Sequence, residues 1–433
     1  MKVQLMLTSF IRRSLFRNLT FAAGFVFAQA AFAQGPSDSH WVTTWATANL
    51  QPPAVRLGPV GQATPAAQQA LAGFNNQTIR MMVPVSIGGR RVRVQFSNIY
   101  GTTPLLIGAA HLGIHAAESS IAAGSDRALT FGGKNSFTIP AGAQATSDSV
   151  DLEVPPLSEL AVSLFVTGAT SAPTVHSVGL HSTYVSKQGD FTAQTALSDA
   201  ASTLSWYWLA SVDVLAPNST SAIVAFGDSI TDGAVSTPNT NSSWPSVLAR
   251  RLSTANIAVI NEGISGNRLL RDGAGANALA RFDEDVLSRA GVKWLVVLEG
   301  INDIGRGAGT NANPAEAVTA EELIGAQRQM IERAHVHGIN VIGATLTPYM
   351  GAAYYSEKGE AIRQTVNDWI RNGGAFNGVI DFDAITRDPN NPKTFRTEYD
   401  SGDHLHPGDA GYKAMAEAVD LSLFGVKAAS ASH

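Results

Sequence analysis

The chain has 433 residues, of which 45% are hydrophobic and 15% charged, and its formal net charge is −5. This composition excludes a largely disordered protein, and because nothing in the sequence indicates the concentrated basic surface that nucleic acid requires, nucleic acid is not an expected partner. The length favours two domains, and the lack of cysteine excludes disulfides, thiol nucleophiles and cysteine-ligated metal sites.

The first 33 residues have the pattern of a signal peptide. Four basic side chains precede an apolar run at 19–27, and Ala31-Phe32-Ala33 matches the small-residue pattern at which signal peptidase cleaves. The apolar run is short for a membrane span, although an uncleaved N-terminal anchor is the alternative reading. We therefore expect cleavage after Ala33, a secreted or periplasmic protein, and no stable membrane insertion afterwards.

Residues 40–215 are predicted to form an all-β domain of the sandwich or jelly-roll kind. Runs at 78–83 and 91–96 flank Gly88-Gly89, a pattern typical of a hairpin with a glycine turn. Further short apolar runs without a helical period indicate more strands. They lie at 105–114, 136–139, 160–166, 181–186 and 205–214.

Two groups of side chains in this half have competing interpretations. His111 and His115 have the spacing of zinc ligands on a helix, but they lie in a β-like run without a companion acid at metal-site spacing, so we interpret them as structural. Trp206, Tyr207 and Trp208 are residue types found on sugar-stacking faces, but core packing is the more common role of aromatic residues in a strand.

A short polar segment at 216–220 precedes a second half with a different pattern. Apolar runs alternate with segments of helical spacing, which predicts a three-layer α/β/α domain with a parallel sheet at 221–425. Ligands in such sheets bind beyond the carboxyl ends of the strands. The apolar runs lie at 222–226, 257–260, 292–298, 340–346 and 379–382, and the helical segments at 244–252, 278–288, 317–335, 361–371 and 409–423.

Gly227-Asp228-Ser229 follows the first apolar run of the second half. A serine on a glycine-bounded turn between a strand and a helix exposes its hydroxyl at the sheet edge. Its backbone N–H lies at a helix N-terminus, where negative charge is stabilised. Asp and Ser are also ordinary helix N-caps, so a simple capping turn is the alternative reading of this motif.

The second and third apolar runs are followed by blocks that contain Gly266 and Asn302. Acyl transfer builds negative charge on the former carbonyl oxygen and needs hydrogen-bond donors fixed around it. Gly266 can offer a backbone N–H and Asn302 a side-chain amide, although a glycine turn and an Asx turn explain each motif equally well when taken singly. The Gly- and Asn-rich segment at 305–313 predicts a loop, which by its position is a candidate for the cleft rim.

Near the C-terminus, Asp403 precedes His406 by three residues, so one loop can present both side chains. A serine nucleophile needs a neighbouring base, usually histidine, which a third group orients. His404 is the rival base, and we favour His406 because Pro407-Gly408 fixes the loop directly after it. A loop histidine beside a capping aspartate is the alternative reading.

Together these four blocks, in this order, resemble the SGNH, or GDSL, hydrolase family over residues 221–425. The resemblance implies a serine esterase with an α/β fold. In it, Ser229 is the nucleophile, and Asp403 and His406 complete the catalytic triad. Gly266 and Asn302 join the backbone N–H of Ser229 in the oxyanion hole.

Two details of the sequence bear on this resemblance. Ile230-Thr231 stands where the family often has leucine, a change that touches no catalytic atom. No Gly-x-Ser-x-Gly is present, so the α/β-hydrolase alternative lacks its nucleophile elbow. The mechanism implied by the family is a two-step acyl transfer that requires no metal and no cofactor.

The arrangement of a β-half before such a domain also looks similar to two-domain carbohydrate esterases. We therefore predict a secreted serine ester hydrolase that cleaves short acyl groups, above all acetyl. Its substrate partner is expected to be a small-molecule or polysaccharide ester, with carbohydrate as the favoured alcohol. A lipase or lysophospholipase with a broad apolar cleft is one alternative. A carbohydrate-binding surface protein with an inactive hydrolase domain is the other.

Overall fold

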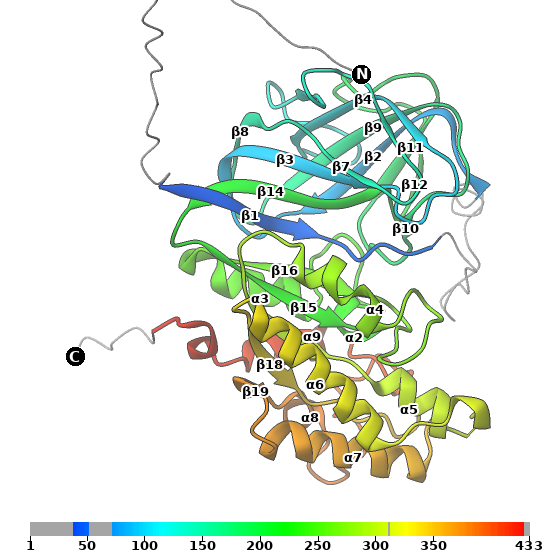
Figure 1. Ribbon diagram of the computed structural model, residues 1–433, viewed down its shortest axis with the longest axis vertical. Coiled ribbons are helices and arrows are strands. Elements are labelled where there is room, and N and C mark those ends of the chain that lie inside the picture. Colours follow the sequence, from blue (N-terminus) through cyan, green and yellow to red (C-terminus); the bar gives the residue numbers. More distant parts are fainter. Residues whose placement is uncertain (1–37, 52–71, 311, 428–433) are drawn as a thin grey trace, which may run out of the picture. The chain divides into compact units, whose positions relative to one another are not determined.

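The computed structural model describes residues 38–51, 72–310 and 312–427. The signal peptide predicted at 1–33 lies outside these residues. Within the described ranges, no helix is long and apolar enough to cross a membrane. Figure 1 shows a first half built of strands, which the chain leaves to form a second half where strands alternate with helices.

The first half contains two large sheets, whose described strand pairs are antiparallel. The five-stranded sheet contains β1 (Ser39–Ala46), β14 (Leu209–Pro217), β3 (Gly89–Ser97) and β7 (Gln144–Thr146) in this order, with β8 (Val150–Val154) also paired to β3. The seven-stranded sheet contains β12 (Ala201–Thr203), β11 (Thr183–Gln188), β2 (Asn75–Pro84), β9 (Glu159–Ala169), β4 (Leu105–Ile114) and β5 (Arg127–Leu129), with β6 (Phe137–Ile139) paired to β4. A short ribbon joins β10 (Val175–His176) to β13 (Trp206–Tyr207).

Alternating side chains give each of these sheets a face that contributes to a common core. On β3, Val92, Val94 and Phe96 are fully buried, whereas the intervening Arg93 and Gln95 are only half-buried. Ile79 of β2, in the other sheet, is equally buried and belongs to the same hydrophobic cluster. The predicted β-rich half is therefore confirmed as antiparallel, with two sheets sharing one core.

The hairpin predicted across Gly88-Gly89 is wrong. The two strands form, but β2 pairs with β9 and β11, whereas β3 pairs with β14, β7 and β8. The chain therefore crosses from one sheet to the other at this point. The glycines permit close approach: a Cβ on Gly88 would lie 2.3 Å from the carbonyl oxygen of Val154, and one on Gly89 would lie 2.8 Å from Cβ of Val214.

The three consecutive aromatic residues at the end of this half pack in the core. Trp206, Tyr207 and Trp208 are all at least nine-tenths buried. The indole N–H of Trp206 donates to the carbonyl oxygen of Met82 (2.9 Å), as a buried polar tip requires. Core packing is therefore the role that the structure assigns to these residues.

The second half is a five-stranded parallel sheet in the order β16-β15-β17-β18-β19. Its strands are rich in fully buried aliphatic residues, as expected when helices cover both faces. The predicted α/β architecture with a parallel sheet is confirmed. The strands are β15 (Ser221–Gly227), β16 (Ile257–Gly263), β17 (Val292–Leu298), β18 (Asn340–Ala344) and β19 (Gly378–Ile380).

The helices of this half form two groups. Helix α3 packs against α9, whereas α4, α6 and α7 pack in sequence against one another. Right-handed crossovers place such groups on opposite faces of the sheet, which gives three layers. The longer helices are α3 (Trp244–Leu252), α5 (Ile301–Ala308), α6 (Ala320–Val336), α7 (Glu357–Asn372) and α9 (Asp409–Glu417), and the shorter ones are α2 (Ser229–Asp232), α4 (Ala278–Phe282) and α8 (Phe382–Thr386).

Several predicted boundaries shift for local reasons. The segment predicted at 278–288 changes after Phe282 into a π-helical turn, Asp283–Leu287. Helix α6 begins only after Thr319, whose side chain and that of Glu322 form a reciprocal capping box. The last predicted helix ends at Glu417, and Leu421–Phe424 form a separate 3₁₀ turn.

Strand order decides where a site can form. The chain passes from β15 to its neighbour β16 and then to β17 on the other side of β15. Such a reversal leaves a crevice at the carboxyl ends of the strands. The segments after β15, β16 and β17 therefore meet at this edge.

Candidate active site

Ser229 begins helix α2 and is separated from β15 only by Asp228. The Asp228 carboxylate caps the helix by accepting a hydrogen bond from the Ile230 N–H (3.0 Å). Gly227 lets the strand end lie close to β17, because a Cβ there would lie 2.2 Å from the carbonyl oxygen of Leu298. This turn fixes Ser229 at the sheet edge, at the start of a helix where backbone N–H groups lack intrahelical partners.

The loop before α9 brings His406 and Asp403 to Ser229. His406 Nε2 lies 2.7 Å from Ser229 Oγ, and His406 Nδ1 lies 2.6 Å from Asp403 Oδ2. Asp403 Oδ1 accepts hydrogen bonds from the backbone N–H groups of Leu405 (2.9 Å) and His406 (2.8 Å). Because an ionised carboxylate only accepts, Nδ1 carries a proton and Nε2 can accept the one on the serine hydroxyl.

The rival histidine has a different partner. His404 Nδ1 lies 2.5 Å from Asp400 Oδ2, and half of the His404 side chain is exposed. Its ring also packs on Gly351, where a Cβ would lie 2.8 Å from Cγ of His404. The structure therefore separates the two candidates: His406 contacts Ser229, and His404 is held by Asp400.

The segment around Gly266 is held between α2 and the helix that carries Asn302. The Ser265 N–H donates to Asp232 Oδ2 (2.9 Å), and Asn302 Nδ2 donates to the carbonyl oxygen of Asn267 (2.9 Å). Gly266 lies between these two contacts with a φ of +82°, which glycine adopts without strain. The two predicted oxyanion donors thus lie in segments that are hydrogen-bonded to each other.

Asn302 is itself oriented by Tyr354. The Tyr354 hydroxyl donates to Asn302 Oδ1 (3.3 Å), so the amide keeps one hydrogen beyond the one given to Asn267. The loop predicted at 305–313 is wrong for 305–308, which are part of α5. Gly305 serves close packing there, since a Cβ would lie 2.4 Å from the Tyr354 ring.

The second half also matches a known protein family. Residues 223–419 correspond to the GDSL-like lipase/acylhydrolase family. This region is a GDSL-like lipase/acylhydrolase domain. The GDSL domain therefore contains Ser229, Gly266, Asn302, Asp403 and His406, and its family activity is acyl hydrolysis.

Solved structures with similarity to this chain include members of the same family. A lipolytic protein of the G-D-S-L family from Desulfitobacterium hafniense has 26% identity and a TM-score of 0.36, over 46% of this chain and 97% of its own. A catalytic mutant of an acetylxylan esterase from Geobacillus stearothermophilus has 21% identity and a TM-score of 0.38, over 48% and 96%. A carbohydrate acetylesterase family member from Sinorhizobium meliloti has 17% identity and a TM-score of 0.38, over 48% and 100%. No curated protein matches significantly.

Arg281, which the sequence did not identify as a site residue, hydrogen-bonds to three segments of the GDSL domain. Its guanidinium donates to the carbonyl oxygens of Gly227 (2.9 Å) and Glu262 (2.7 Å) and to Asn267 Oδ1 (2.9 Å). The ends of β15 and β16 are thereby tied to the Gly266 segment. A charged residue inside an apolar helical segment was the only signal in the sequence, because its partners lie far away along the chain.

The carboxyl groups near Ser229 have opposite pKa shifts. Burial raises the pKa of Asp228 to about 7, although the hydrogen bond from the Ile230 N–H and the charge of His406 both act to lower it. Burial and the charge of Asp228 raise the pKa of Glu299 well above its usual value. Partial burial also acts to raise the pKa of Asp403, but the hydrogen bonds from the His406 ring and from the loop N–H groups lower it below its usual range. Asp403 is therefore ionised at neutral pH.

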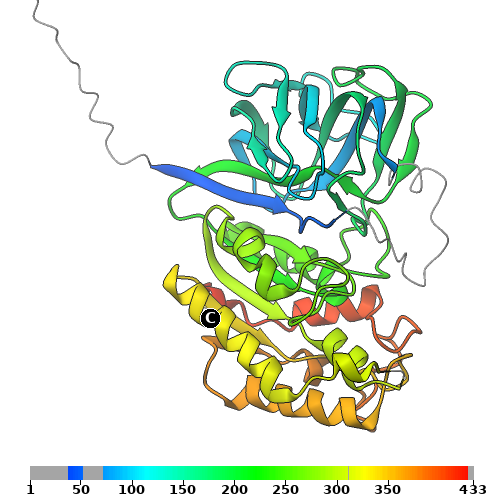
Figure 2. The same ribbon diagram turned by 45° about the vertical axis from the view of Figure 1, so that its right-hand side comes forward.

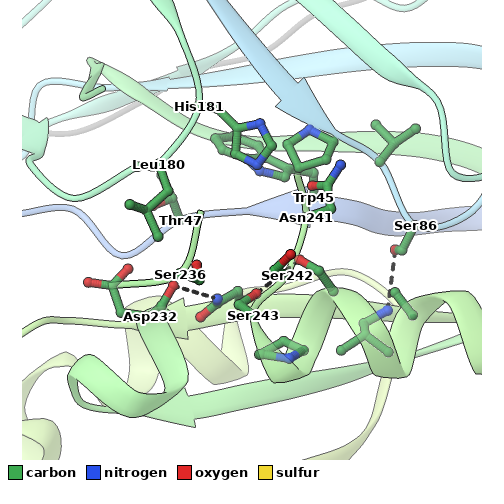
Figure 3. A pocket seen from close by; sticks show the side chains of 18 of the residues that line it. Trp45, Thr47, Ser86, Leu180, His181, Asp232, Ser236, Asn241, Ser242 and Ser243 are labelled. Carbon is green, nitrogen blue, oxygen red and sulfur yellow. Dashed lines mark hydrogen bonds between the residues drawn. The ribbon is translucent and has the colours of Figure 1, made fainter. Parts of the chain in front are cut away.

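A separate cavity of about 170 Å³ lies between the two halves (Figure 3). Trp45 and His181 line it from the antiparallel half, and Asp232, Asn241 and Ser243 line it from the GDSL domain (Figure 3). Neither Ser229 nor His406 is among its lining residues. The cavity is therefore distinct from the candidate triad, although Asp232 ends the helix that Ser229 begins.

The two histidines considered as metal ligands have carboxylate partners. His111 Nδ1 lies 2.9 Å from Asp126 Oδ2, and His115 Nδ1 lies 2.8 Å from Glu159 Oε2. Across the described parts of the chain, no three His, Cys, Asp or Glu side chains gather as a metal-binding group.

The raised pKa of Asp228 predicts a pH-dependent stability. The folded state binds a proton on Asp228 between about pH 4 and 7 that the unfolded chain has released, so this residue makes the unfolding free energy fall as pH rises through that window. Asp228→Asn keeps a capping oxygen but cannot titrate. The unfolding free energy, measured with urea at both pH values, should fall less from pH 5 to pH 8 in this variant than in the wild type.

The exposed Asp199 supplies the control. Asp199→Asn should preserve the wild-type pH dependence. An identical pH dependence in Asp228→Asn and the wild type would contradict the assigned shift.

Proposed function

We propose that the protein is a secreted serine ester hydrolase that removes short acyl groups, above all acetyl, from carbohydrate esters. The observation that carries the proposal is the continuous hydrogen-bonded line from Ser229 Oγ through the His406 ring to Asp403. Membership of the second half in an acylhydrolase family supports the same reaction class. The signal-peptide pattern at 1–33 supports export.

In the proposed mechanism, His406 Nε2 removes the proton of Ser229 as Oγ attacks the ester carbonyl carbon. The carbonyl oxygen becomes an oxyanion, which accepts hydrogen bonds from the N–H groups of Ser229 and Gly266 and from the Asn302 amide. His406 then gives its proton to the leaving alcohol. Water repeats the sequence on the acyl-enzyme, which releases the acid and restores the serine hydroxyl.

The packing beside Asn302 supports a short acyl group. Tyr354 closes on this residue through its hydroxyl and on Gly305 through its ring. We infer from this aromatic side chain, which lies next to a proposed oxyanion donor, that the acyl chain on that side is short. The antiparallel half reaches the other end of α2, where it can contribute to binding the alcohol part of the ester.

Ser229→Ala is expected to reduce turnover of p-nitrophenyl acetate to background, because no other side chain of the protein attacks the ester carbonyl carbon in the proposed mechanism. Ser219→Ala, at an exposed serine before β15, is the matched control and should retain wild-type turnover. Near wild-type turnover in Ser229→Ala would refute the nucleophile assignment.

Asn302→Ala is expected to lower kcat by about 10²- to 10³-fold with little change in KM, because an oxyanion donor acts mainly in the transition state. Steady-state kinetics on p-nitrophenyl acetate measures both constants. A change confined to KM would show that Asn302 binds substrate and does not stabilise the oxyanion.

The substrate class is tested by p-nitrophenyl esters from C2 to C16, assayed beside acetylated xylan and pectin. A short acyl pocket predicts a steep loss of kcat/KM beyond C4 and release of acetate from at least one polysaccharide. A rise of kcat/KM toward C12 would contradict the short-acyl proposal and favour a lipase.

A further inference from the structure

The antiparallel half contributes a histidine to the nucleophile helix of the GDSL domain. His176 belongs to β10, and its Nε2 lies 3.1 Å from Oδ1 of Asp232, the last residue of α2. Its Nδ1 lies 2.8 Å from the carbonyl oxygen of Ala48. Only 3% of His176 and 8% of Asp232 is exposed. The contact is therefore a buried link between the two halves.

The partners of the ring fix its protonation state. A carbonyl oxygen and a carboxylate both accept hydrogen bonds, so both ring nitrogens of His176 must carry protons. Burial acts to lower the pKa of His176, but the charge and hydrogen bond of Asp232, the Ala48 carbonyl and the charge of Asp285 raise it above its usual value. His176 and Asp232 thus form a buried ion pair.

Asp232 also binds the segment that contains Gly266, the candidate oxyanion donor. Its second oxygen, Oδ2, accepts hydrogen bonds from both the N–H (2.9 Å) and the Oγ (2.6 Å) of Ser265. Ser265 directly precedes Gly266, whose N–H is a proposed oxyanion donor. One carboxylate therefore holds His176 of the antiparallel half, the end of α2 and the residue before Gly266.

We propose that His176 is a positioning residue of the esterase site, which acts on Gly266 through Asp232 and Ser265. The antiparallel half is then a working part of the active site, because it orients the end of α2 and the Gly266 N–H. The inference rests on the proposed function. A misplaced oxyanion donor should lower kcat and leave KM nearly unchanged.

Two conservative variants separate the contacts of the ring. In His176→Gln the side-chain amide nitrogen takes the place of Nε2 and can still donate to Asp232. In His176→Asn the shorter amide takes the place of Nδ1, keeps the donor to Ala48 and loses the one to Asp232. His111→Gln, which removes a histidine–carboxylate contact elsewhere in the same half, controls for a general loss of stability.

The experiment measures kcat and KM on p-nitrophenyl acetate and the thermal midpoint of the full-length variants. His176→Asn should lower kcat by about 10- to 100-fold with KM nearly unchanged, His176→Gln should restore most of that loss, and His111→Gln should retain wild-type kcat. Equal activity of the Asn and Gln variants, or a change in KM alone, would overturn the proposal. Inactivity of the wild type on every ester would instead refute the proposed function.

Ser265→Ala tests the same chain of contacts from its other end and keeps the proposal testable if His176→Asn does not fold. It removes one hydrogen bond to Asp232 and should also lower kcat selectively. Where both variants fold, the effects of His176→Asn and Ser265→Ala should be less than additive, because they break one pathway. Unchanged kcat in Ser265→Ala, or full additivity, would contradict the pathway.

Discussion

The hydrogen bond between Ser229 Oγ and His406 Nε2 joins residues that are 177 positions apart in the sequence. Two constraints bring them together. The parallel sheet places Ser229 at the carboxyl end of its second strand in spatial order, β15, and the loop before α9 is folded around Asp403. That carboxylate binds the imidazole of His406 and two N–H groups of its own loop, so the orientation of the imidazole and the shape of the loop depend on the same group.

The surroundings of this contact include buried polar side chains that hydrogen-bond to the backbone of the neighbouring segments. Arg281 holds the ends of β15 and β16 and the segment that contains Gly266 through one guanidinium. Asp303 adds another tie by accepting hydrogen bonds from the N–H groups of Leu269 (2.7 Å) and Leu270 (3.1 Å), so the helix of Asn302 is fastened to the chain beyond Gly266. Buried polar groups of this kind stabilise a single arrangement only when most of their partners are satisfied.

Hydrogen bonds that involve backbone groups also join the two halves. The Thr43 N–H of β1 donates to the carbonyl oxygen of Ala290 (3.0 Å), and the Val259 N–H of β16 donates to Ser86 Oγ (3.2 Å). Both halves also contribute to one hydrophobic cluster. These contacts give the antiparallel half a fixed position on the GDSL domain, which a positioning role for His176 requires.

The periodicity of the apolar residues and the order of the short motifs were sufficient to predict the α/β half and its parallel sheet. They also predicted the residues, His406 and Asp403, that the structure brings beside Ser229. They failed where spatial neighbours decide the role of a residue. Gly88 and Gly305 were interpreted as turn and loop residues, but each is small because a neighbouring backbone or ring lies close. His176 stands in no motif, since its partner Asp232 belongs to the other half of the chain. The sequence also could not show whether β2 and β3 pair with each other, because two glycines between strands are typical both of a hairpin turn and of a connection between two sheets.

The most direct test is to label the protein with a fluorophosphonate, to identify the labelled residue by peptide mass analysis, and to compare the labelling rate between histidine variants. We predict stoichiometric phosphonylation of Ser229 in the wild type and in His404→Gln, and strongly slowed labelling in His406→Gln. Labelling at another residue, or a His406→Gln variant that reacts as fast as the wild type, would contradict the claim that Ser229 is activated by His406.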